Sequence, residues 1–163
     1  MNAPVITIRN IEPADNAAIA AIIRKSLEEF GANHPGTVYF DVDTDRLYEL
    51  FQTPGSWYFI CELDGKIIGG AGVFPTKGLP EGVCELVKMY LHKDARGKGL
   101  GKKMLHTCFA KAKALGYQKM YLETMPELTI AVPMYEQNGF EYLTAPMGES
   151  GHFGCAIQML KTL

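Results

Sequence analysis

The spacing of apolar residues along the chain predicts a succession of short strands and amphipathic helices. Apolar residues at every second position indicate a strand, and apolar residues at every third or fourth position indicate a helix. By this criterion, strands are predicted over residues 5–9, 57–62, 66–74, 83–91, 119–123, 140–143 and 153–160. Helices are predicted over residues 13–30, 43–51, 100–115 and 127–138, the last of them interrupted by Pro133.

The connections between these segments predict how the strands pair. Asp64 and Gly65 separate the second and third strands, and Asp-Gly between two apolar runs is a strong hairpin signal. The first half of the chain is therefore expected to form antiparallel sheet. Residues 83–91, the helix that follows and residues 119–123 form a strand–helix–strand unit, which is expected to be a right-handed crossover with parallel pairing.

The connection between the fourth strand and the third helix is rich in glycine. Glycine can adopt positive φ and lets a ligand approach the backbone. The first amide groups of the helix have no partner within it, so they point toward whatever lies in front of them. A diphosphate site is therefore predicted, although short glycine motifs also occur by accident in plain connections. The segment reads Arg96, Gly97, Lys98, Gly99, Leu100 and Gly101, and Lys102 and Lys103 follow it.

Composition and charge are those of an ordinary globular protein. The chain has 163 residues, which predicts one domain over residues 1–163. Its net charge of −2 gives no overall basic field, so nucleic acid is not an expected partner. No apolar run reaches the roughly 18 residues of a membrane span, and no signal peptide precedes the first strand. The cysteines form no C-x-x-C pair, so we expect a cytoplasmic protein with buried thiols and no metal site.

With these elements in order, the chain resembles the GNAT superfamily of N-acetyltransferases. The turn matches that family's Arg/Gln-x-x-Gly-x-Gly/Ala pattern at Arg96, Gly99 and Gly101, and the segment from Tyr135 to Phe140 fits as well. The resemblance implies an α/β (α+β) fold of the acyl-CoA N-acyltransferase type. In this fold a mixed central sheet of about seven strands is flanked by about four helices and splays at its fourth strand.

The resemblance also implies acetyl-CoA as co-substrate. The backbone of residues 96–102 would hold its pyrophosphate, and the fourth strand would hydrogen-bond its pantetheine arm. One departure is that many members carry Asn near the end of the next strand, where this chain has Glu123 and Thr124. The implied binding residues are Met89, Tyr90, Leu91, Arg96, Gly97, Lys98, Gly99, Leu100, Gly101 and Lys102.

Glu85 and Tyr135 are the candidate catalytic residues. An amine with a pKa near 10.4 is neutral in only about one molecule in 2,500 at pH 7, so a base must take its proton. Glu85 lies within an apolar run, where burial would raise its pKa toward the range of a general base acting directly or through water. Period-two counting places it on one face with Val83, Val87 and Met89, which favours burial unless a bulge shifts the register. An exposed or Lys88-paired Glu85 is the alternative.

By resemblance, Tyr135 would be the general acid that protonates the departing CoA thiolate. The alternative is an aromatic packing residue before the helix ends. An acyl-enzyme intermediate on Cys84 or Cys108 finds little support, since neither has a basic motif beside it. The histidines are scattered without ligand spacing, and His34 is the most interesting of them because its loop could border the acceptor.

The acceptor itself is expected to be a small-molecule or peptide amine. Loops over residues 31–40 and 75–82 are the candidate walls of its pocket, and a homodimer is plausible. The acids beside the first loop would attract a cationic amine, although helix ends commonly carry solvated acids. These acids are Glu28, Glu29, Asp41, Asp43 and Asp45.

The function predicted from these residues is acetyl transfer to a primary amine by direct attack in a ternary complex. One alternative is a non-catalytic acyl-CoA sensor or interaction domain on the same scaffold, with Glu85 and Tyr135 chemically idle. A dinucleotide-binding enzyme is another, because Glu123 ends the strand after the glycine turn. That motif requires a third glycine where this chain has Lys102.

Overall fold

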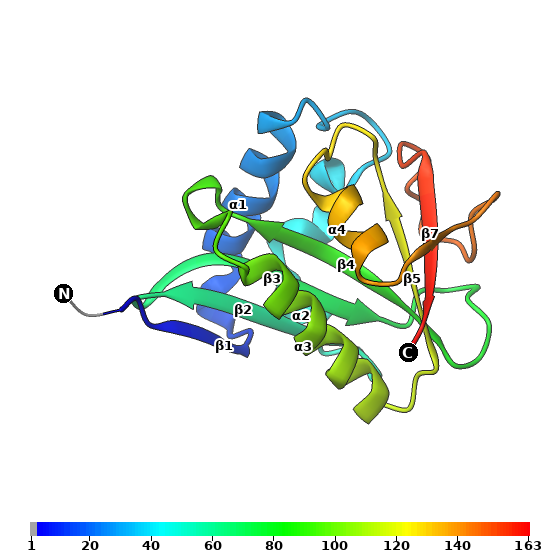
Figure 1. The fold of residues 1–163 in the computed structure, drawn as a ribbon, viewed down its shortest axis with the longest axis horizontal. Coiled ribbons are helices and arrows are strands. Elements are labelled where there is room, and N and C mark those ends of the chain that lie inside the picture. Colours follow the sequence, from blue (N-terminus) through cyan, green and yellow to red (C-terminus); the bar gives the residue numbers. More distant parts are fainter. Residues whose placement is uncertain (1–2) are drawn as a thin grey trace.

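The computed structural model describes residues 3–163, and a seven-stranded mixed sheet forms its centre (Figure 1). The strand order is β1-β2-β3-β4-β5-β7-β6. Only β4 and β5 pair in parallel among these neighbours, and every other pair is antiparallel. The predicted hairpin and the parallel pairing of the crossover are thus confirmed. The strands are β1 (Ile6–Asn10), β2 (Trp57–Leu63), β3 (Lys66–Phe74), β4 (Val83–Leu91), β5 (Lys119–Thr124), β6 (Glu141–Tyr142) and β7 (Ile157–Thr162).

Helices cover both faces of this sheet. On one face, α1 buries Ile19, Ile23 and Leu27 against Tyr58 and Ile60 of β2. On the other, α3 crosses in front of the strands in Figure 1 and packs against β3 and β4. No helix within residues 3–163 is both long and apolar enough to cross a membrane. The α-helices are α1 (Asn16–Glu29), α2 (Leu47–Leu50), α3 (Leu100–Ala114) and α4 (Ala131–Gln137), and short 3-10 helices are η1 (Pro13–Asp15), η2 (Val38–Phe40), η3 (Val42–Asp45) and η4 (Lys93–Ala95).

Several predicted elements are shorter than their sequence patterns suggest, and the predicted strand over 140–143 is reduced to Glu141–Tyr142. The predicted helix over 43–51 is divided into η3 and the single turn of α2. The predicted helix over 127–138 begins at Ala131, so Pro133 lies in its first turn, where backbone N–H groups have no partner within the helix and proline is tolerated. The last strand begins at Ile157, because Gly154 and Cys155 donate their backbone N–H groups to Gly36 and His152 instead of a neighbouring strand.

The sheet splays between β4 and β5. Their pairing ends where Glu85 faces Tyr121. Beyond that point β4 continues to pair with β3 as far as Leu91, and β5 continues to pair with β7 as far as Thr124. The two strands therefore diverge, and the space between them is where the functional residues gather.

A bulge at Lys88 redirects the end of β4. Gly70 pairs with Tyr90, whereas Gly72 pairs with Val87, and Lys88 has a φ of +52°. Val87, before the bulge, packs with the core under α1. Met89, after the bulge, packs with the core under α3. The prediction that Glu85 shares a face with Met89 is therefore wrong, because one extra residue reverses the alternation of side chains.

Candidate active site

A cavity of about 260 Å³ lies between the end of β4, the glycine turn and α4. Its wall contains all of the predicted cofactor residues except Lys98. Residues from α1 and from the segment around α4 complete it, among them Ser26, Phe30, Met134 and Tyr135. The end of one strand and the following turn thus form a continuous wall that a long, narrow ligand can follow.

The glycines of the turn have two different roles. Gly97 and Gly99 have φ of +76° and +75°, a conformation that other residues resist. Gly101 lies in α3, so its predicted positive φ is not needed there. Instead, a Cβ at Gly101 would lie 3.1 Å from the sulfur of Met134 and 3.6 Å from Leu91, both of which line the cavity. Gly101 therefore keeps the cavity open beside the N-terminus of α3, whose amide groups are suited to a phosphate.

Arg96 fixes the turn to the rest of the fold. Its Nη2 donates a 2.9 Å hydrogen bond to the carbonyl of Leu91, and its guanidinium pairs with Glu29. The same group lies 4.8 Å from the centre of the Phe30 ring. The side chain thus ties β4, α1 and the turn together, while the backbone of the turn remains available to a ligand.

A second, smaller cavity of about 40 Å³ opens where β4 and β5 diverge. Ionisable side chains line it together with apolar ones such as Leu122 and Met125. The two cavities share four wall residues, so they are adjacent. The ionisable residues are Glu85, Lys88, Glu123 and His152, and the shared ones are Met89, Tyr90, Leu128 and Tyr135.

Glu85 lines this smaller cavity and is buried, with 3% of its surface exposed. Burial raises its pKa to about 7, and the negative charge of Glu123 adds to this effect. The hydroxyl of Thr76 donates to its Oε1, and this bond opposes the rise. Lys88 pairs with Asp41 at 3.6 Å. Glu85 is therefore neither exposed nor paired with Lys88, and its role as general base stays a prediction.

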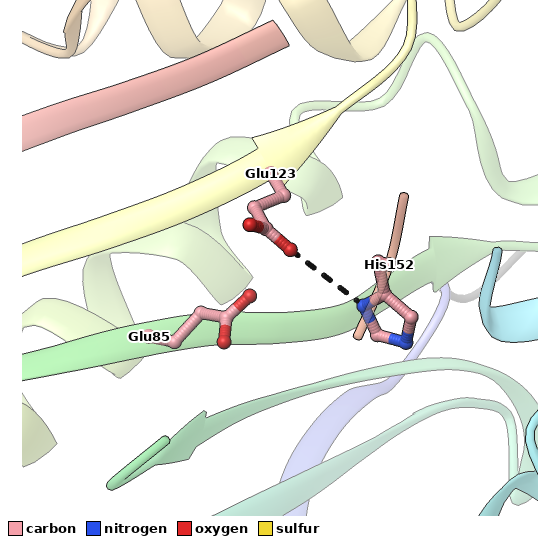
Figure 2. A group of neighbouring side chains, drawn as sticks. All are labelled: Glu85, Glu123 and His152. Atoms are coloured by element: carbon pink, nitrogen blue, oxygen red, sulfur yellow. Dashed lines mark ion pairs between the residues drawn. The ribbon is translucent and has the colours of Figure 1, made fainter. Parts of the chain in front are cut away.

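Figure 2 shows that Glu123 and His152 face Glu85 across the splay. Glu123 accepts hydrogen bonds from the hydroxyls of Tyr121, at 2.7 Å, and Ser150. One ligand-type atom from each of Glu85, Glu123 and His152 lies within 4.8 Å of the others. Two carboxylates and an imidazole could hold a divalent cation, so the expectation of no metal site stays a prediction.

Glu123 and His152 are not among the site residues predicted from the sequence. Glu123 had a usable signal, because it lies two residues beyond Tyr121, which pairs with Glu85, and strand alternation places it on the same face. His152 had none, since it belongs to an irregular segment between β6 and β7. The predicted histidine, His34, bonds Glu127 at 3.0 Å and lines neither cavity.

Tyr135 lies on α4 at the junction of the two cavities. Burial raises its pKa above the usual value of tyrosine, so it carries its proton at neutral pH. Cys84 and Cys108 line neither cavity, and burial raises the pKa of both thiols to about 12. The role of Tyr135 as general acid stays a prediction, whereas a cysteine nucleophile is disfavoured.

The predicted acceptor loops contribute less than expected. Val38 lines the smaller cavity, and Thr76 supports Glu85. Three of the five loop acids have partners elsewhere, and Asp41 reaches inward to Lys88 and His152. Those three are Glu28 with Tyr39, Glu29 with Arg96 and Asp45 with Arg24.

Comparison with known proteins agrees with this geometry. The model of the acetyltransferase (GNAT) family matches residues 19–140, a range that includes the glycine turn and both candidate catalytic residues. The chain belongs to this family. The uncharacterized N-acetyltransferase YjgM of Escherichia coli is 37% identical over 157 residues, which are 96% of this chain and 94% of that protein. These relationships place the chain among acetyltransferases.

Solved structures share the GNAT fold over nearly the whole chain. A GNAT acetyltransferase from Staphylococcus aureus has a TM-score of 0.86 at 19% identity and covers 98% of this chain and 99% of its own. The acetyltransferase yncA of Salmonella typhimurium, described with its cofactor acetyl-CoA, has a TM-score of 0.73 at 27% identity. It covers 98% of this chain and 94% of its own.

Proposed function

We propose that the chain transfers the acetyl group of acetyl-CoA to a primary amine by direct attack in a ternary complex. The observation that carries the proposal is Glu85, a buried carboxylate with a pKa of about 7 in a small cavity adjoining a larger one. A base with a pKa near the working pH is the group that a cationic amine requires before it can attack. The family membership supports the acetyl donor.

The larger cavity fits a nucleotide thioester. The glycine turn and the N-terminus of α3 offer backbone amides to a pyrophosphate, and Met89, Tyr90 and Leu91 line the path beyond. Gly101 leaves room that a side chain would fill. When bound there, acetyl-CoA supplies an activated acyl group at the junction with the smaller cavity.

Glu85 would accept a proton from the ammonium group of the acceptor, directly or through water. The free amine nitrogen then forms a bond to the thioester carbonyl carbon, and the C–S bond breaks. Tyr135 would donate its proton to the departing CoA thiolate, and the second proton that the nitrogen loses as the amide forms would restore the Tyr135 hydroxyl. Since a thiol has a pKa near 8.5 and a protonated amine near 10.4, loss of the base should cost more than loss of the acid.

The test is an amine panel assayed by release of the free CoA thiol, with acetyl-CoA affinity measured separately by calorimetry. The panel contains polyamines, aminoglycosides, amino acids, small monoamines and peptides with a free N-terminus or lysine. Turnover with at least one amine, lost in Glu85→Gln while acetyl-CoA affinity is retained, is expected. Tight acetyl-CoA binding without turnover on any amine would instead support a sensor or interaction domain.

A further inference from the structure

The ring of His152 lies between two carboxylates that come from distant parts of the chain. Its Nε2 is 2.7 Å from Oδ2 of Asp41, just before η3, and its Nδ1 is 3.7 Å from Oε1 of Glu123, on β5 (Figure 2 shows the second pair). Neutral imidazole has one N–H group, whereas imidazolium has two. Only the protonated ring therefore presents a hydrogen to both carboxylates.

We propose that His152 is a positioning residue, held as an imidazolium between Asp41 and Glu123, that fixes the wall of the acceptor cavity and keeps Glu85 ionisable. The inference rests on the proposed function for its catalytic consequence, and on the two carboxylates beside the ring for its charge. It adds to the expected base and acid a third group, which acts through Glu85 and Glu123.

The charges around His152 are consistent with a cation at this position. Asp41, Glu123 and Glu85 face the ring from the η2–η3 segment, β5 and β4, and Lys88 is the nearby cation. The side chain of His152 is only 14% exposed. Burial works against its charge, but the hydrogen bond and the charge of Asp41 outweigh burial and raise the pKa of His152.

The consequence for catalysis concerns Glu85. Three carboxylates and two cations leave one net negative charge when Glu85 is ionised, and a cationic amine would balance it. One ring nitrogen of His152 and one carboxylate oxygen of Glu85 lie within 4.8 Å of each other. The positive charge of His152 lowers the pKa of Glu85, whereas burial and the negative charge of Glu123 raise it. Without it, Glu85 would hold its proton at higher pH and act as a base over a narrower range.

The first test is the pH profile of kcat/KM for wild type, His152→Gln and His34→Gln. His34 is the matched control, because it also pairs with a glutamate but lines neither cavity. In His152→Gln the acidic limb should move upward by about one pH unit, since removing an opposite charge at this distance has an effect of that size. His34→Gln should leave the limb in place. An unmoved limb in His152→Gln would overturn the proposal.

The second test needs no activity and therefore separates this inference from the proposed function. NMR titration of histidine-labelled protein should show His152 losing its proton above the ordinary histidine pKa of 6.5, and Asp41→Asn should lower that midpoint. Titration of His152 at or below pH 6.5 would refute the imidazolium. Loss of transferase activity on dialysis against EDTA, with recovery in Zn²⁺, would also refute the imidazolium, because a histidine that binds a metal ion must be neutral.

Discussion

The two cavities that meet at Tyr135 differ in the chemical groups that line them. The larger one is walled by the end of β4, the glycine turn and mostly apolar side chains from around α1 and α4, and the groups that it offers to a phosphate are the backbone of the turn and the N-terminus of α3. The smaller one depends on ionisable side chains from β4, β5 and the segment between β6 and β7. A backbone site should tolerate most changes except added bulk, whereas a site of buried charges should respond to the loss of a single one.

The largest expected effect is on catalysis and concerns the smaller cavity, which is lined by charged side chains. Glu85→Gln should lower kcat by about 10²- to 10⁴-fold, the range typical of a lost general base, with acetyl-CoA affinity unchanged. Tyr135→Phe, at the junction, should cost less, because the thiolate is the easier group to accommodate. Steady-state kinetics on both variants with one active amine would decide the order. The reverse order would mean that Tyr135 carries the difficult proton transfer.

Glu85→Gln should also stabilise the protein at alkaline pH. Glu85 has a pKa of about 7 in the fold against a reference value of 4.5, so the folded state binds its proton more tightly than the unfolded state. Its contribution to stability is therefore complete below pH 4.5 and is lost as pH rises through 7. Glutamine stays neutral, so Glu85→Gln should be more stable than wild type by about 2 to 3 kcal/mol at pH 8.

Urea denaturation at pH 8 and at pH 4.5 measures this difference. The gain should be present at pH 8 and absent at pH 4.5, where wild-type Glu85 is itself protonated. An equal gain at both pH values would mean that the effect comes from packing. A loss of stability at pH 8 would mean that the ionised carboxylate has a partner that stabilises it in the fold.

The contrast between the cavities also explains what the sequence could predict. The glycine turn and the start of α3 are local features, since glycine and apolar spacing lie within a few dozen residues of each other, whereas the divergence after β4 was expected only from the resemblance to the GNAT superfamily. His152 and Asp41 are 111 positions apart, and nothing in the chain between them signals their contact. The position of the bulge at Lys88 was also beyond prediction, because no glycine marks its positive φ.

An effect of intermediate size is expected on acetyl-CoA affinity, through the larger cavity. Gly101→Val places methyl groups toward Met134 and Leu91, so acetyl-CoA affinity should fall about tenfold or more, a cost of roughly 1.4 kcal/mol. Ala110→Val, on the exposed side of the same helix, is the matched control and should leave affinity unchanged. Calorimetry measures both. Undiminished binding by Gly101→Val would place the cofactor outside this cavity.

The smallest expected effect is at Thr124, which lies near the end of β5 and lines the smaller cavity. Its Oγ1 is buried without a hydrogen-bond partner within the described part of the chain. An unsatisfied hydroxyl costs stability, so Thr124→Val should stabilise the protein by about 1 kcal/mol. Thr44→Val is the matched control and should destabilise it by a similar amount, because the hydroxyl of Thr44 donates a 2.8 Å bond to Val38. If Thr124→Val instead weakened acetyl-CoA or amine binding, the Thr124 hydroxyl would be a ligand contact in the smaller cavity and not an unsatisfied group.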